Sequence, residues 1–201
     1  MYKLSQFLYS SKLGDGCFYR RKESHTCLFQ FTSYNKEYID FMHKEFDKLG
    51  YFPQGIKRVY SGFKNGSEGY YFHTRVHEDF NYVSSLSIKE AISMLDKEGL
   101  IFYYLDDGSY HKNKNFGHIY CNTFTVDEVN CLIDKIYELY PIRKCTIHWD
   151  KKRDGRKYPY IYIPVSVMDA FKSDIKNMLD ICDLKSFYYK IGLPSQTTEK
   201  Q

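Results

Sequence analysis

The sequence predicts a mixed α/β (α+β) fold built from two pseudo-symmetric αββαββα repeats, each with its own antiparallel sheet. Three observations predict this fold: the order of elements repeats along the 201 residues, each copy opens on an apolar helix with an acidic turn, and strands of alternating side chains follow. We expect the copies to occupy residues 1–95 and 96–201. Hydrophobic residues make up 43% of the chain, which is ample for a packed core.

The opening helix of each copy is expected to end in the acidic turn. The first motif, LYSSKLGDG, covers residues 8–16, and the second, LIFYYLDDG, covers residues 100–108. Asp and Gly are common where helices end, so either turn alone carries little information. Their recurrence at equivalent places of a repeat favours a functional role for both.

The middle helix of each copy is predicted by apolar spacing. In the second copy, Thr125 and Glu128 form a capping-box pattern, and apolar residues follow at helical spacing as far as Ile136. Residues 34–49 are the counterpart in the first copy.

The strands are predicted where polar residues alternate with β-branched or aromatic ones, as in Tyr158, Tyr160 and Tyr162, between turns such as NGSEG and DGRK. A further helix closes each copy. Residues 84–99 join the copies and are expected to be helical and to span the pseudo-twofold axis. The tail from about residue 194 is expected to be disordered.

Composition argues against several classes of protein. The six cysteines show no CxxC pair and no Cys–His spacing suited to zinc, and we expect them to be reduced thiols. No signal peptide is recognised, and no apolar run approaches the roughly 20 residues that a membrane-spanning helix needs. We therefore expect an intracellular protein with no membrane partner, located in a bacterial or phage-infected cytoplasm or in an organelle.

The two motifs and four further stretches (GLIFYYLDDGS, IYCNTFTVDEVNCLIDKIYELY, YIYIPVSVMDAF and YYFHTRVHEDF) resemble the double-motif, monomeric LAGLIDADG homing endonucleases. The resemblance extends over about residues 4–193. It implies saddle-shaped sheets that face DNA and a site-specific, metal-dependent phosphodiester cut in a long double-stranded target.

The resemblance also implies a metal site at the two acidic turns. The acid before the last Gly of each motif would bind the metal, which gives Asp15 and Asp107. Carboxylates suit Mg²⁺, and Mn²⁺ is expected to substitute for it. Gly14 and Asp106 precede the two acids and complete the predicted metal site, although the Asp106 side chain is expected to point elsewhere than that of Asp107.

Family members tend to carry a basic residue near each active site. Lys190, in FYYKIGLP, matches that residue in the second copy and joins Asp15 and Asp107 as a predicted catalytic residue. In the first copy the corresponding loop is shortened to NYVSSLSIKE, where Lys89 and, earlier, His77 are the possible substitutes. This departure suggests either that one DNA strand is cut in preference to the other or that cleavage is slow.

Basic residues gather in equivalent hairpins of both copies, although any single one has a simpler interpretation as a solvated turn residue. As a set they predict a surface that binds phosphates. The predicted DNA-binding residues are Arg20, Arg21, Lys22, Lys57, Arg58, Lys64, Arg75, Lys112, Lys114, Arg143, Lys144, Lys151, Lys152, Arg153, Arg156 and Lys157.

Two other functions are compatible with the sequence. The same fold could serve as an intron RNA maturase or as a DNA-binding protein that does not cut, although retention of both acids favours the enzyme. Six of the histidines invite comparison with zinc or HNH-like nucleases, but no pair shows ligand spacing around a general base, and a structural or DNA-contacting role is expected. They are His25, His73, His77, His111, His118 and His148.

Overall fold

The computed structural model describes residues 4–20, 25–60, 68–152 and 155–195. Most of the tail that was expected to be disordered, residues 196–201, lies outside the described residues. None of the described helices combines the length and the apolar character needed to cross a membrane.

The first half follows the predicted order and adds one short helix at its end. Its elements are α1 (Leu4–Leu13), β1 (Gly16–Arg20), β2 (Cys27–Ser33), α2 (Lys36–Lys48), β3 (Lys57–Tyr60), β4 (Glu68–His73), α3 (Glu78–Ser85) and α4 (Ile88–Ser93).

The second half repeats this order and ends on a short 3₁₀ helix, η1. Its elements are α5 (Lys97–Asp107), β5 (Gly108–His111), β6 (Phe116–Tyr120), α6 (Val126–Leu139), β7 (Thr146–Lys151), β8 (Lys157–Ile163), α7 (Val165–Cys182) and η1 (Lys185–Ile191).

The strands form two four-stranded antiparallel sheets with matching topology. Their strand orders are β1-β2-β4-β3 and β5-β6-β8-β7, so each strand has its counterpart in the other half. The predicted fold class is thereby confirmed, whereas the division at residues 95 and 96 stays a prediction.

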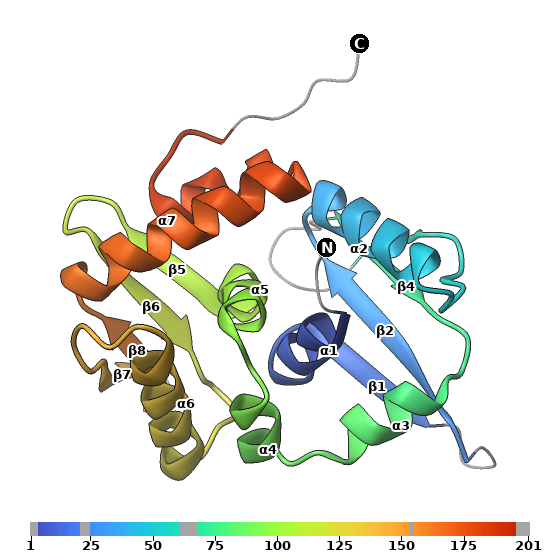
Figure 1. Cartoon of the computed structure of the whole chain (residues 1–201), viewed down its shortest axis with the longest axis horizontal. Coiled ribbons are helices and arrows are strands. Elements are labelled where there is room, and N and C mark those ends of the chain that lie inside the picture. Colours follow the sequence, from blue (N-terminus) through green and yellow to red (C-terminus); the bar gives the residue numbers. More distant parts are fainter. Residues whose placement is uncertain (1–3, 21–24, 61–67, 153–154, 196–201) are drawn as a thin grey trace.

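The motif helices α1 and α5 lie side by side at the centre of the molecule, between the two sheets (Figure 1). Phe7 of α1 packs against Phe102 of α5 with ring centroids 3.8 Å apart. Helices cover one face of each sheet, where alternate strand residues such as Phe29, Ile119 and Ile161 are fully buried. The opposite side of each sheet, its open face, carries half-buried and exposed side chains.

Side-chain caps account for where the middle helices begin. Thr125 and Glu128 form the capping box of α6, as the sequence predicts. In α2 the side chain of Asn35 accepts from the backbone N–H of Tyr38 instead.

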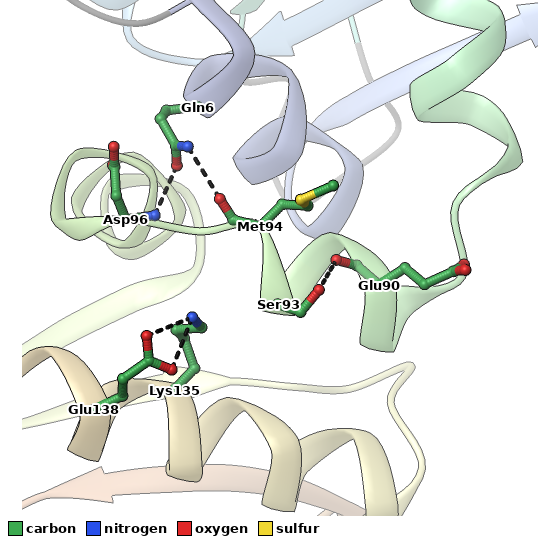
Figure 2. Close-up of polar contacts among 7 residues, drawn as sticks. All are labelled: Gln6, Glu90, Ser93, Met94, Asp96, Lys135 and Glu138. Atoms are coloured by element: carbon green, nitrogen blue, oxygen red, sulfur yellow. Dashed lines mark hydrogen bonds and ion pairs between the residues drawn. The ribbon is translucent and has the colours of Figure 1, made fainter.

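The segment that joins the halves is only partly helical. Between α4 and α5 the helix is broken, and Gln6 of α1 binds the break: its Nε2 donates to the Met94 carbonyl at 3.0 Å, and its Oε1 accepts from the Asp96 N–H at 2.8 Å (Figure 2). Asp96 then caps α5 by accepting from the N–H groups of Glu98 and Gly99. This contact fixes the first motif helix to the start of the second.

Candidate metal centre and nucleic-acid interface

The two acidic turns meet where α1 and α5 end. Burial and, secondly, the negative charge of Asp15 raise the pKa of Asp107 to about 7, against the opposing influence of Lys190. Burial also raises the pKa of Asp15, again against the influence of Lys190. Each carboxyl group therefore lies in a buried environment that disfavours its ionised form when no cation is bound.

Asp106 does not point away from this site, and that expectation was wrong. Its Oδ2 accepts from the backbone N–H of Asp15 at 3.4 Å, and a Cβ atom at Gly14 would lie only 2.7 Å from the same oxygen. Burial, together with the charges of Asp15 and Asp107, raises its pKa well above the usual range. The Asp106 carboxyl therefore packs into the space that the glycine of the first motif leaves open.

The last segment of the second half, η1, holds Lys190 next to the acids. Lys190 is only 8% exposed, and its Nζ donates to the carbonyl of Gly108 at 2.5 Å. Tyr104 of α5 donates its hydroxyl to the Lys190 carbonyl at 3.0 Å. Burial lowers the pKa of Lys190, and Asp106, Asp107 and Asp15 counteract that shift.

The segment that carries Lys190 also contacts the first half. Glu37 of α2 accepts from the N–H of Ser186 at 3.1 Å, and Asn35 donates to the Ser186 hydroxyl at 2.8 Å. The Tyr38 ring meets Phe187 edge-on at 5.0 Å. η1 therefore bridges the halves and holds Lys190 near acids from both motifs.

Neither substitute for a first-half basic residue reaches the acids. The Nζ of Lys89 on α4 pairs with Asp127 of α6 at 3.7 Å. His77 caps α3 by accepting from the N–H of Asp79 at 3.3 Å. Lys89 therefore links α4 to α6 of the second half and His77 caps α3, so neither side chain is directed to the acids.

A cavity of about 310 Å³ adjoins the acids on the side of the first sheet. Asp15, Asp106 and Lys190 line one end, and Tyr34 and Val59 line the other. Sequence reasoning missed this space because residues of six separate elements and their flanking turns enclose it.

The predicted DNA-binding residues fall into three groups. Arg21, Lys22, Lys64 and Arg153 lie outside the described residues. Those at strand ends and turns of the sheets are Arg20, Lys57, Lys112, Lys114, Arg143, Lys151, Lys152, Arg156 and Lys157.

The third group consists of Lys144, Arg58 and Arg75, whose side chains contact partners within the chain. Lys144 pairs at 2.6 Å with Asp134 of α6, on the helical side of the sheet. Arg58 lies on the opposite face of its strand from Lys57 and pairs with Glu68 at 2.9 Å. Arg75 stacks on the Phe52 ring at 5.3 Å.

The cysteines and histidines form no metal site among the described residues. All six cysteines are free, and four of them are buried. No set of three or more His, Cys, Asp and Glu side chains in the described ranges is placed to hold one ion.

Comparison with known proteins gives one family. Residues 5–171 match the LAGLIDADG DNA endonuclease family. No curated protein sequence matches the chain.

Solved structures share the fold at low sequence identity. The homing endonuclease I-WcaI bound to its DNA recognition sequence is 20% identical, with 94% of this chain and 86% of that chain covered and a TM-score of 0.73. I-DmoI in complex with DNA and Mn is 18% identical, with 86% and 95% covered and a TM-score of 0.58. I-DmoI in complex with DNA and Ca gives 18% identity, 86% and 88% coverage and a TM-score of 0.56.

Proposed function

The chain belongs to the LAGLIDADG DNA endonuclease family, and from this premise we propose that it is a homing endonuclease that makes a site-specific, metal-dependent cut in double-stranded DNA. The observation that carries the proposal is the meeting of the two acidic turns at the paired ends of α1 and α5, where the Asp15 N–H donates at 3.4 Å to Oδ2 of Asp106, the residue next to Asp107. Because both motifs are on one chain, a single copy supplies the whole site, and we propose a monomer.

The residues at the turns fit a divalent cation. Their donors are carboxylate oxygens, which hard cations prefer, and the Asp106 carboxyl is buried beside them next to the Tyr38 hydroxyl. Since the described side chains provide no complete ligand set, an ion held by Asp15 and Asp107 would take further oxygens from water and from a DNA phosphate. This incomplete set suits Mg²⁺, and we propose Mg²⁺ with Mn²⁺ as a substitute.

A divalent cation bound there supplies positive charge that stabilises the developing charge on the phosphate and makes water a stronger acid. The chain's own residues then have separate roles. Asp15 and Asp107 hold the cation, and their raised pKa values show that the site without a cation disfavours two bare carboxylates. Lys190, fixed by Gly108 and Tyr104, places an ammonium group where it can orient water or a phosphate oxygen.

We also propose that the two strands are cut at unequal rates. Lys190 comes from the second half, and the first-half candidates Lys89 and His77 are engaged elsewhere. The alternatives, an RNA maturase or a DNA-binding protein that does not cut, are not favoured, because a pure binding module gains nothing from two acids facing phosphates.

The experiment uses a duplex selected for binding. An Asp15→Asn/Asp107→Asn double variant, which lacks the charge that repels phosphate, would select its site from random duplex DNA without cutting it. The wild type should then cut that duplex only with added Mg²⁺ or Mn²⁺. Each single variant should lose activity on the order of a thousandfold while it still binds, as expected when one electrostatic stabiliser of the reaction is removed.

Asp127→Asn, an exposed change on α6, is the matched control and should cut normally. Cutting that survives in either single active-site variant would contradict the proposed mechanism. Tight RNA binding by a wild type that cuts no selected duplex would favour the maturase.

A further inference from the structure

The open face of the second sheet carries a continuous layer of rings. Strand alternation and register place them together, since His118 pairs with Tyr162, Tyr120 with Tyr160, and His111 with Phe116. The ring layer consists of His111, Phe116, His118, Tyr120, His148, Tyr158, Tyr160 and Tyr162.

The rings pack against one another across neighbouring strands. His118 lies 4.6 Å from Tyr160, Phe116 lies 5.1 Å from Tyr162, and His148 lies 5.2 Å from Tyr162, all between ring centroids. Such contacts restrict rotamers, so the layer is organised before any partner binds.

The first sheet presents different chemistry on its open face. There Gln30 is paired with His73, and Thr32 and Lys57 flank Tyr71. An amide and an ammonium group can hydrogen-bond to the edges of adenine and guanine. On the corresponding positions of β5 to β8, all of them described, no Lys or Arg occurs.

Cationic side chains flank the ring layer instead of occupying it. Lys112 and Lys114 lie in the turn between β5 and β6, and Lys151, Lys152 and Arg156 lie at the turn between β7 and β8. A polyanion is therefore complementary to the edges of this face, where Lys152 also pairs with Asp150 at 2.6 Å, while its centre offers apolar and uncharged groups. Burial and the neighbouring His148 and His111 lower the pKa of His118.

We propose that the second sheet recognises a thymine-rich DNA half-site, through contacts between its ring layer and the thymine methyl groups in the major groove. Thymine is the base that presents a methyl group there, and aromatic side chains are suited to contact it, whereas guanine is read mainly by Arg and Lys. This inference rests on the proposed function, because it assumes that the open faces bind duplex DNA.

The test removes methyl groups alone. Duplex sites selected with the Asp15→Asn/Asp107→Asn variant should be rich in thymine in one half, and deoxyuridine would then replace each thymine in turn. At contacted positions in that half, affinity should fall by about fourfold per methyl, the value expected for one buried methyl group. Phe116→Ala and Tyr120→Ala should each abolish this sensitivity at particular positions.

Tyr137→Ala, on the exposed side of α6, is the matched control and should keep the full sensitivity. Circular dichroism would confirm that each variant is folded, and Tyr120, 37% exposed, is the milder change of the two.

The outcomes separate this inference from the proposed function. If the wild type cuts the selected duplex but deoxyuridine has no effect, or the selected half is rich in guanine, only the ring-layer proposal is overturned. If single-stranded nucleic acid binds this face more tightly than any duplex, the rings stack on unpaired bases, and the proposal also fails. If no duplex is bound at all, both proposals fail together.

Discussion

The two halves share an order of elements and an order of strands, yet they surround their acids differently. In the second half η1 docks on the start of α2 and brings Lys190 beneath the turns. In the first half α4 takes the corresponding place against α6, but Lys89 faces Asp127 there. The repeat therefore brings both acids to the paired ends of α1 and α5, whereas the short segments that end each half decide which basic group accompanies them.

Lys190→Met tests this difference between the halves and should have the largest effect of the variants considered. The change keeps the apolar stem and removes the ammonium group, so cleavage should slow by about a hundredfold, the lower range for loss of a positioned proton donor or acceptor. Single-turnover rates on the selected duplex would measure it. Lys185→Met, at the exposed start of the same 3₁₀ helix, should cut at the wild-type rate, and an equal loss in both variants would assign the effect to η1 packing.

Gly14→Ala tests the fit between the motifs. A methyl group there would meet Asp106 Oδ2, so we expect a loss of about 2 kcal/mol in the free energy of unfolding, typical of an overpacked site. Urea denaturation would measure it. Asp106→Ala in the same chain should restore most of the loss. If Gly14→Ala is neutral, or Asp106→Ala restores nothing, the two motifs do not interlock in this way.

The raised pKa of Asp107 predicts a pH dependence of stability in the protein without divalent cations. Its pKa is about 7 in the fold against 3.8 in the unfolded chain, so between these values the folded state binds more protons. Stability should therefore fall as the pH rises from about 5 to about 8, by on the order of 2 kcal/mol after allowance for partial solvent screening.

Denaturation at several pH values with EDTA would measure this slope. Asp107→Asn should flatten it, and Mg²⁺ should restore stability at the higher pH because the cation favours the ionised acids. A slope that is unchanged in Asp107→Asn would assign it to other groups.

Gln6→Ala tests the contact that joins the motif helices and should have the smallest effect. It leaves the Met94 carbonyl and the Asp96 N–H without their partner, which should cost about 1–2 kcal/mol of stability. Ser93→Ala is the nearby control, since its hydroxyl donates to the Glu90 carbonyl at an exposed position (Figure 2), and thermal denaturation should show little change. Equal shifts in both variants would show that the Gln6 contact adds nothing specific.

Much of the fold could be predicted because local patterns and the repeat agree. The capping box at Thr125 and the apolar spacing after it define α6, and the two motifs locate the central helices. The break between α4 and α5 was not predicted, although the Asp96 cap of α5 lies there; the contacts that Gln6 adds come from a residue far away in the sequence.

The candidate site was predicted less completely. A turn motif indicates where an acid lies along the chain, but it cannot show that Asp106 packs against Gly14 of the other motif. Lys89 and His77 lie in the stretch before the second motif where a basic residue was expected. In the structure Lys89 pairs with Asp127 and His77 accepts from the N–H of Asp79. The alternation of Tyr158, Tyr160 and Tyr162 indicated a strand, whereas the ring layer emerges only when four strands are aligned.

The most direct test of unequal halves is the course of cleavage on a supercoiled plasmid that carries the selected site. If Lys190 serves one strand better than the other, nicked circles should accumulate before linear DNA appears, and strand-specific end labels should show one strand cut first. Direct conversion to linear DNA with no nicked intermediate, at equal rates for the two strands, would contradict the account.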